Sequence, residues 1–468
     1  MKLPFELGDT EGLSREEIRK RKRQVAQMQA YSIVGAAVFV LLLVIIIVVI
    51  ISTGAFHKDK SENVANNEET QVVEEASEEE NVSAAQQVAD AVAEQEAEEA
   101  RENAQAEEAG VVDEATILDD AISKYIENMT LEEKVAALFF VTPEQLTNVN
   151  KAVAAGSSTS SAIAEYAVGG ILYSERNMVD PDQFLEMVTN TRSFCKYETF
   201  MGVADEGGAT SPFATAKMVD EPIPSQAETT TVADAYSNGI AAGNRLRSFG
   251  LDLNLAPVTD VVLANGSAVA KRAFEGDVED VISMSKNEMK GMLDASIHCA
   301  VKYFPSYGDS KSDGSTGKVS TKRTKEDLEA TEYNVYKQLI AEGAEMIMVS
   351  TISMPEITED DTPACFSDKI VTDILRKDLG YEGIVLTDYV SKASISKTYK
   401  QEAVGVQAIL AGCDMIVSPM KFKQEYQGVL NAIEEGTITE ERIEESIYRI
   451  YRVKYKNMID YENYSFEQ

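Results

Sequence analysis

The stretch "GIVLTD", residues 383–388, decides the fold of this 468-residue chain. It is a short apolar run with β-branched residues, and it ends in a threonine and an aspartate. A run of this length, bounded by turn residues, is typical of a buried strand. Seven other runs of the same kind occur along the chain: "VAALFFV" (135–141), "GGILYS" (169–174), "TFMGVAD" (199–205), "LDLNLAP" (251–257), "SIHCAVKYF" (296–304), "EMIMVSTIS" (345–353) and "DMIVSP" (414–419).

Most of the segments between these runs are long enough to form a helix. Apolar strands that alternate with helices predict an α/β fold with parallel pairing, and most simply a closed (β/α)₈ barrel of the TIM type. We expect the barrel to cover residues 117–462. An open doubly wound sheet is the alternative, although no GxGxxG fingerprint follows any of the runs.

The N-terminal part of the chain predicts a membrane anchor. Residues 33–51, "IVGAAVFVLLLVIIIVVII", contain no charge and are long enough to span a bilayer as a helix. The basic stretch "REEIRKRKR", residues 15–23, precedes this run and should stay on the cytoplasmic side. We therefore expect residues 1–30 to be cytoplasmic, 31–54 to form a single-pass transmembrane helix, and the barrel to be extracytoplasmic. A signal peptide cleaved after Ala55 is the alternative, but its apolar core would be unusually long.

Residues 55–116 are predicted to form an acidic, low-complexity linker. Their composition is dominated by Glu, Ala and Gln, which cannot bury a core. A solvated spacer is the simpler interpretation, and an acidic interaction tail is the alternative. The formal net charge of the whole chain is −36, which disfavours nucleic acid as a partner.

Polar residues follow several of the predicted strands. Asp205, Glu206, Asp260, Lys302 and Asp388 stand at or just after strand ends, where the active sites of such barrels lie. Carboxylates gathered at one mouth suit glycoside hydrolysis, in which one carboxylate attacks the sugar and a second group protonates the leaving oxygen. Acidic residues at strand ends are also common as helix caps, so a structural role is the alternative for each of them.

The motifs together resemble the N-terminal barrel domain of glycoside hydrolase family 3, and most closely its single-domain bacterial β-N-acetylhexosaminidases. The resemblance runs from "MTLEEKVAALFFV", which starts at Met129, to "ERIEESIYRIYRVKYK", which ends at Lys456. Between them it includes "VGGILYSERN", "VADEGG", "GLDLNLAPVTDV", "KRAF", "KYFPSYGDSKSDGS", "TPACFSDKIVTDILRKDLGYEGIVLTD" and "AGCDMIVSP". It implies a retaining glycosidase. We expect no cofactor, and no zinc site because the four cysteines are widely spaced and form no CxxC or Cys/His cluster.

The resemblance implies a role for particular residues. Asp388 in "LTDYV" matches the catalytic nucleophile. Asp313 matches the aspartate that orients the acid/base histidine in this family. The residues that match or replace sugar-binding positions are Asp205, Glu206, Arg272, Lys302, Tyr303 and Tyr307.

The loop after Lys302, "YFPSYGDSKSDGST", departs from the family pattern. Tyr303 and Tyr307 replace two histidines, and Ser315 stands where the acid/base histidine belongs. A serine hydroxyl does not ionise near neutrality and cannot act as a general acid. Within the same loop, "DSKSDG" (309–314) has only part of a calcium-loop pattern, so no metal is expected.

Two functions are therefore open, and a barrel repurposed for unrelated chemistry is a third for which no phosphate loop or metal cluster speaks. The first is a membrane-anchored, extracytoplasmic glycoside hydrolase that cleaves O-glycosyl bonds of amino-sugar glycans in cell walls or the environment. The alternative is a catalytically impaired relative that binds a glycan or a protein partner at the same mouth.

Overall fold

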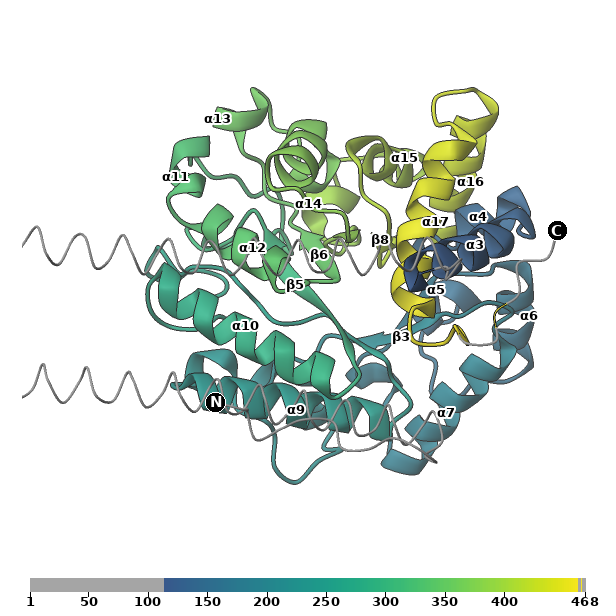
Figure 1. Ribbon diagram of the computed structural model, residues 1–468, viewed down its shortest axis with the longest axis horizontal. Helices are drawn as coiled ribbons and strands as arrows, with labels where there is room; N and C mark the ends of the chain where they lie inside the picture. Colours follow the sequence, from purple (N-terminus) through teal and green to yellow (C-terminus); the bar gives the residue numbers. More distant parts are fainter. Residues whose placement is uncertain (1–112, 462–463, 465–468) are drawn as a thin grey trace, which may run out of the picture. The chain divides into compact units, whose positions relative to one another are not determined.

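The computed structural model describes residues 113–461 and residue 464 (Figure 1). The predicted cytoplasmic segment 1–30, the predicted anchor 31–54 and all but the last four residues of the predicted linker 55–116 lie outside this part. None of the helices within the described residues combines the length and apolar character that crossing a membrane requires. The described part opens with helix α3 (Glu114–Glu127), whose first turn is capped by the side chain of Asp113.

Eight short parallel strands form a nearly closed barrel. They are β1 (Phe139–Val141), β2 (Gly170–Leu172), β3 (Phe200–Val203), β4 (Leu253–Asn254), β5 (His298–Phe304), β6 (Met346–Val349), β7 (Ile384–Thr387) and β8 (Ile416–Val417). Their order is β7-β6-β5-β4-β3-β2-β1-β8. A parallel bridge between Leu386 and Met415, with a 3.0 Å hydrogen bond from Thr387 N to Met415 O, joins β7 to β8. The predicted TIM-like fold is therefore confirmed.

Each predicted apolar run contains one strand, but in the first run the strand begins later than the sequence predicts. Val135 and Ala136 belong to helix α4 (Leu131–Ala136), and the strand begins only at Phe139. Thr130 and Glu133 form a capping box, which favours a helix over the N-terminal half of the apolar run. The correction leaves the strand order unchanged.

Helices and short helical turns connect the strands and surround the barrel (Figure 1). Before β5 these are α5 (Pro143–Thr147), α6 (Ser157–Glu165), η1 (Glu175–Asn177), α7 (Pro181–Phe194), η2 (Gly208–Thr210), α8 (Pro212–Thr215), η3 (Gln226–Glu228), α9 (Val232–Ser248) and α10 (Val278–Asp294). After β5 they are α11 (Lys325–Glu329), α12 (Glu332–Ala341), α13 (Pro355–Thr358), η4 (Ala364–Phe366), the π-helical segment η5 (Lys369–Asp378), α14 (Ala393–Ser396), α15 (Gln401–Ala411), α16 (Phe422–Glu434) and α17 (Glu440–Tyr455).

The inside of the barrel is a packed core. All residues of β1, β2 and β3 are buried, and the ring of Phe140 on β1 occupies the space beside Gly170 on β2 and Gly202 on β3. A Cβ atom on Gly170 would lie 2.3 Å from this ring, and one on Gly202 would lie 2.6 Å from it. The glycines in "GGILYS" and "TFMGVAD" thus make room for a large side chain, as close packing in a small barrel requires.

Candidate functional site

The candidate site lies at the carboxyl end of the strands and is centred on Asp388. This residue directly follows β7, and its backbone N–H donates to Val349 O of β6 at 2.7 Å. Its side chain is almost fully buried, yet it has three donors. Tyr307 Oη donates to Asp388 Oδ2 at 2.8 Å and Lys392 Nζ donates to the same oxygen at 2.6 Å, whereas among the described residues Oδ1 accepts only the backbone N–H of Tyr389, at 2.7 Å. The two oxygens of the predicted nucleophile are therefore not equivalent.

Tyr307 supports Asp388 from inside the protein. Its side chain is completely buried, and its hydroxyl oxygen accepts the backbone N–H of Thr351 at 2.7 Å. The Tyr307 hydroxyl therefore links Thr351, which follows β6, to Asp388, which follows β7, through two hydrogen bonds. Burial and the nearby Asp388 raise the pKa of Tyr307 well above its ordinary value, so the phenol keeps its proton and remains a donor to the carboxylate. The structure places this predicted sugar-binding residue behind the nucleophile.

Asp260 organises the start of the loop that carries Tyr303 and Tyr307. Its carboxylate accepts the backbone N–H of Tyr303 at 3.0 Å, the Ser306 hydroxyl at 3.0 Å, and the backbone N–H of Tyr307. No cation pairs with it in the described part of the chain, and burial raises its pKa to about 6. The sequence placed Asp260 at a strand end, but its contacts identify a structural role.

Glu206 forms the second charged centre of the site. Arg272 donates to both of its oxygens at 2.6 Å, and Lys302 Nζ lies 2.5 Å from Oε1. Burial alone would raise the pKa of Glu206, but Lys302 and Arg272 outweigh it and lower the pKa to about 2. Arg272 also donates to Tyr303 Oη at 2.6 Å. Four residues predicted to bind sugar therefore meet in one buried network.

Asp205 is held apart from this network. Its Oδ1 accepts the backbone N–H of Gly207 at 3.1 Å, and its Oδ2 lies 3.7 Å from Arg245 of α9, beyond hydrogen-bond distance. Burial raises the pKa of Asp205. The Asp205 carboxylate therefore lies near α9 and not in the Glu206 network.

Asp313 lies close to Asp388, on the loop that follows β5. Lys392 Nζ is 2.6 Å from Asp388 Oδ2 and 3.5 Å from Asp313 Oδ2, so these two oxygens are at most roughly 6 Å apart. Retaining glycosidases hold their two carboxyl groups about 5–5.5 Å apart. Burial would raise the pKa of Asp313, but Lys392 and the backbone and hydroxyl of Ser315 outweigh it and lower the pKa. Asp313 is therefore ionised near neutral pH and is a poor proton donor.

Lys392 is the residue of this site that the sequence did not reveal. It stands four positions after Asp388, in the turn before α14, and its side chain is only 11% exposed. Besides the two carboxylates it binds the backbone oxygen of Asp313, at 2.9 Å. A lysine four positions after a predicted nucleophile could have been singled out in the sequence as a candidate site residue. Only the folded loop, however, shows which groups its ammonium contacts.

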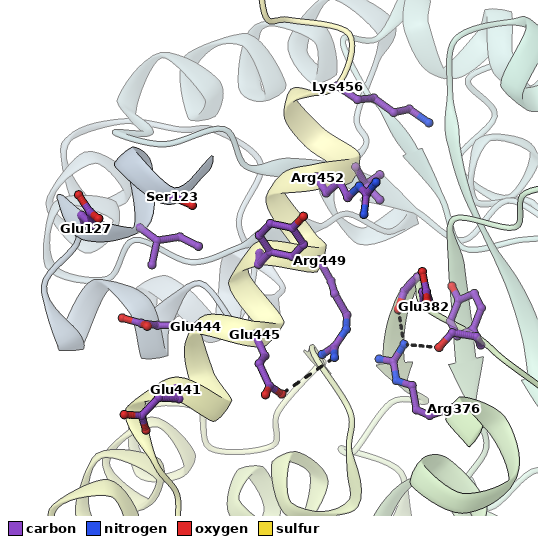
Figure 2. Close-up of a pocket in the computed structure, with 15 residues that line it drawn as sticks. Ser123, Glu127, Arg376, Glu382, Glu441, Glu444, Glu445, Arg449, Arg452 and Lys456 are labelled. Atoms are coloured by element: carbon purple, nitrogen blue, oxygen red, sulfur yellow. Dashed lines mark hydrogen bonds and ion pairs between the residues drawn. The ribbon is translucent and has the colours of Figure 1, made fainter. Parts of the chain in front are cut away.

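A separate groove of ≈ 960 Å³ lies near the amino ends of β6 and β7, away from Asp388 (Figure 2). Figure 2 shows α17 along one side of it, with Glu444, Arg449 and Arg452 on that helix and Lys456 directly after its end. Three of its cations have protein partners: Arg376 and Arg449 both bind the buried Asp414, and Lys456 binds Glu345. Active sites of such barrels lie at the opposite face, so we interpret the groove as structural.

Comparisons with known proteins identify the family of the barrel. A model of the family "Glycosyl hydrolase family 3 N terminal domain" matches residues 130–453. A protein named beta-hexosaminidase from Methylococcus capsulatus is 30% identical over 254 residues, which cover 54% of this chain and 75% of the relative. Another beta-hexosaminidase, from Shewanella frigidimarina, is 29% identical over 273 residues, which cover 56% of this chain and 78% of that protein.

Solved structures give the same result. A glycoside hydrolase family 3 beta-N-acetylglucosaminidase from Paenibacillus has a TM-score of 0.66 and 26% identity, and the match covers 73% of this chain. The chain spans only 64% of that structure's length. A Beta-N-acetylhexosaminidase from Beutenbergia cavernae has a TM-score of 0.61 and 25% identity, with 71% of this chain and 99% of that chain covered.

Proposed function

Because the chain belongs to glycoside hydrolase family 3, we propose that it cleaves β-linked N-acetylhexosaminides with Asp388 as a retaining nucleophile. The observation that carries the proposal is the unequal hydrogen bonding of the two carboxylate oxygens of Asp388 at the mouth of the barrel. Its Oδ2 is held by two side-chain donors, while its Oδ1 has a single backbone donor. The less encumbered Oδ1 is the oxygen suited to attack a sugar carbon.

The first chemical step would form a bond from Asp388 Oδ1 to the anomeric carbon and break the bond from that carbon to the leaving oxygen. Water would then cleave the resulting ester and regenerate the carboxylate. The leaving oxygen ordinarily needs a proton. Asp313 has a lowered pKa, and burial raises the pKa of Tyr303 and Tyr307 well above the ordinary value. None of the three is a good donor near neutrality, so we propose that the enzyme acts best on leaving groups that depart as anions.

A series of leaving groups tests the proposal. We expect slow but measurable turnover of 2,4-dinitrophenyl N-acetyl-β-glucosaminide, whose phenol departs without protonation. Natural disaccharides should react at least about 10²- to 10⁴-fold more slowly, the usual contribution of general acid catalysis. Asp388→Ala should abolish the residual reaction. Asp373→Ala, at a surface pair with Lys377, is the matched control and should react like the wild type. Equal rates for wild type and Asp388→Ala would reject hexosaminidase catalysis.

A second candidate function is a barrel that binds a glycan or a protein partner without cleaving it. The observation in its favour is the loop after β5, where Ser315 donates to Asp313 at the position that the family uses for acid/base chemistry. Calorimetric binding of an amino-sugar oligosaccharide, without any turnover of the activated substrate, would select this function.

We also propose that the barrel is held outside the cell by the anchor at residues 31–54. The uncharged run 33–51 and its basic flank support this placement. Protease treatment of intact cells should release a fragment that begins within the acidic linker. A barrel that stays protected until the cells are lysed would contradict the topology.

A further inference from the structure

The ammonium group of Lys392 contacts two aspartates and lies near two tyrosine rings of the site. It binds Asp388 Oδ2 at 2.6 Å and the backbone oxygen of Asp313 at 2.9 Å, and it lies 3.5 Å from the Asp313 carboxylate. The rings of Tyr303 and Tyr307 are 5.3 and 5.1 Å away, within the range of cation–π attraction. One side chain thus connects the end of β7 to the loop that follows β5.

We propose that Lys392 is a positioning residue for the nucleophile. It holds Asp388 Oδ2 turned inward, so that Oδ1 faces the sugar, and it fixes the loop that carries Asp313 over the site. This role rests on the proposed function of Asp388 as nucleophile. It concerns a residue that neither the family match nor the motifs of the sequence single out.

The charges explain why a lysine can serve both steps of the reaction. Before the first step the ammonium lies between two carboxylates. When Asp388 becomes an ester it loses its negative charge, and the Asp313 carboxylate remains beside the ammonium. A buried ammonium without a partner would be costly, so the second carboxylate keeps Lys392 in place through the cycle.

The contacts argue against a proton-donor role for Lys392. Its ammonium already donates to Asp388 Oδ2 and to the backbone oxygen of Asp313, and it lies 3.5 Å from the Asp313 carboxylate, so its hydrogens are directed at groups of the protein. A positioning role predicts an equal slowing for good and poor leaving groups. A proton-donor role predicts that only poor leaving groups are slowed.

The loop has a second attachment beside Lys392. The backbone N–H of Ser394 donates to Gly314 O at 3.0 Å, and Lys392 holds the preceding residue by its backbone oxygen. Loss of the ammonium should therefore loosen the loop whether or not a substrate is turned over. This gives the proposal a readout that does not depend on activity.

The test compares Lys392→Met and Lys392→Ala with Lys397→Met, an exposed lysine on the same segment. We expect Lys392→Met to slow formation of the glycosyl-enzyme at least about 10-fold, by the same factor for phenols of different acidity. Propylammonium should restore part of the activity to Lys392→Ala and leave Lys397→Met unchanged. Hydrogen exchange of the amides at Tyr307 and Gly314 should be faster in Lys392→Met.

Each outcome decides between the roles. An unchanged or faster reaction in Lys392→Met, or slowing confined to poor leaving groups, would overturn the positioning role. Unchanged hydrogen exchange in the loop would overturn it even if the protein proves inactive. Equal rates for wild type and Asp388→Ala would instead reject Asp388 as the nucleophile. Hydrogen exchange at Tyr307 and Gly314 would then show only whether Lys392 holds the loop, and its role toward a nucleophile would be overturned.

Discussion

At the scale of single residues, tyrosines take over positions that the family resemblance assigns to histidines, and the change alters what each position can do. A phenol carries one proton and holds it firmly when buried, whereas an imidazole exchanges protons near neutral pH. Tyr307 accordingly acts as a fixed donor to Asp388, and Tyr303 accepts a hydrogen bond from Arg272. The two tyrosines therefore form fixed hydrogen bonds at positions where a histidine could transfer a proton.

Removal of the Tyr307 hydroxyl tests that network. Tyr307→Phe would leave the backbone N–H of Thr351 without its acceptor and take one donor from Asp388 Oδ2. Buried groups left unpaired cost about 1–3 kcal/mol, so we expect a fall of this size in the free energy of unfolding, measured in urea. Tyr399→Phe is the control, because its hydroxyl has no hydrogen-bond partner among the described residues. Equal stability of the two variants would contradict a supporting role for Tyr307.

At the scale of elements, the loop after β5 packs closely against the residues after β6 and against α14. Gly314 has a positive φ of 86°, and a Cβ atom there would lie 2.6 Å from Thr351 Oγ1 and 2.7 Å from Ser394 Oγ. The loop can approach these two hydroxyls because residue 314 has no side chain. Thr351 in turn contacts Tyr307, so the loop backbone is coupled to the support of Asp388.

Gly314→Ala should therefore displace the loop. We expect a loss of about 1–3 kcal/mol in the free energy of unfolding, from both the strained φ and the crowding, together with slower reaction of the activated substrate. Gly317→Ala, three residues along the same loop, is a matched control because nothing lies within 4 Å of the added Cβ. If the two variants unfold at the same urea concentration, the packing of the loop does not constrain it.

At the scale of the whole molecule, several carboxyl groups are buried without a direct counter-ion in a chain of net charge −36. Glu288 on α10 is the strongest case. Burial and the negative charges of Asp205 and Glu206 raise its pKa to about 8, against a smaller opposing effect of Lys302. Glu288 Oε2 has no hydrogen-bond partner within the described residues.

This burial predicts how stability depends on pH. The ordinary pKa of Glu288 is 4.5 and its folded value is about 8, so between these values the folded chain keeps a proton that the unfolded chain has released. The stability that this proton contributes is complete below about pH 4.5 and is lost as the pH rises through 8. Relative to Glu288→Gln, the wild type should lose on the order of 3 kcal/mol between pH 5 and pH 8.

Urea titrations at several pH values measure this difference. Glu279→Gln, an exposed glutamate on the same helix, is the control and should follow the wild type across the range. Parallel stability curves for wild type and Glu288→Gln would show that Glu288 is ionised in the fold.

The sequence by itself determined the barrel and the place of its mouth, because both depend on local patterns. Short apolar runs separated by helical segments specify parallel strands, and the polar residue that ends each run must lie at the carboxyl face. In this way "GIVLTD" placed Asp388 correctly at the end of β7. The start of the first strand could not be read in the same way, because the capping box of α4 extends a helix into the apolar run.

Only the tertiary structure decided what each site residue contacts. Tyr307 and Asp388 are 81 positions apart, and Asp313 and Lys392 are 79 apart, so their pairing depends on how two loops fold over the barrel. The structure joined Glu206 to Arg272 and Lys302, directed Asp205 toward α9, and placed Lys392 between two carboxylates. Local sequence patterns specify strands and turns, whereas the partner of a buried charge is set by the nearest opposite charge that the fold brings to it.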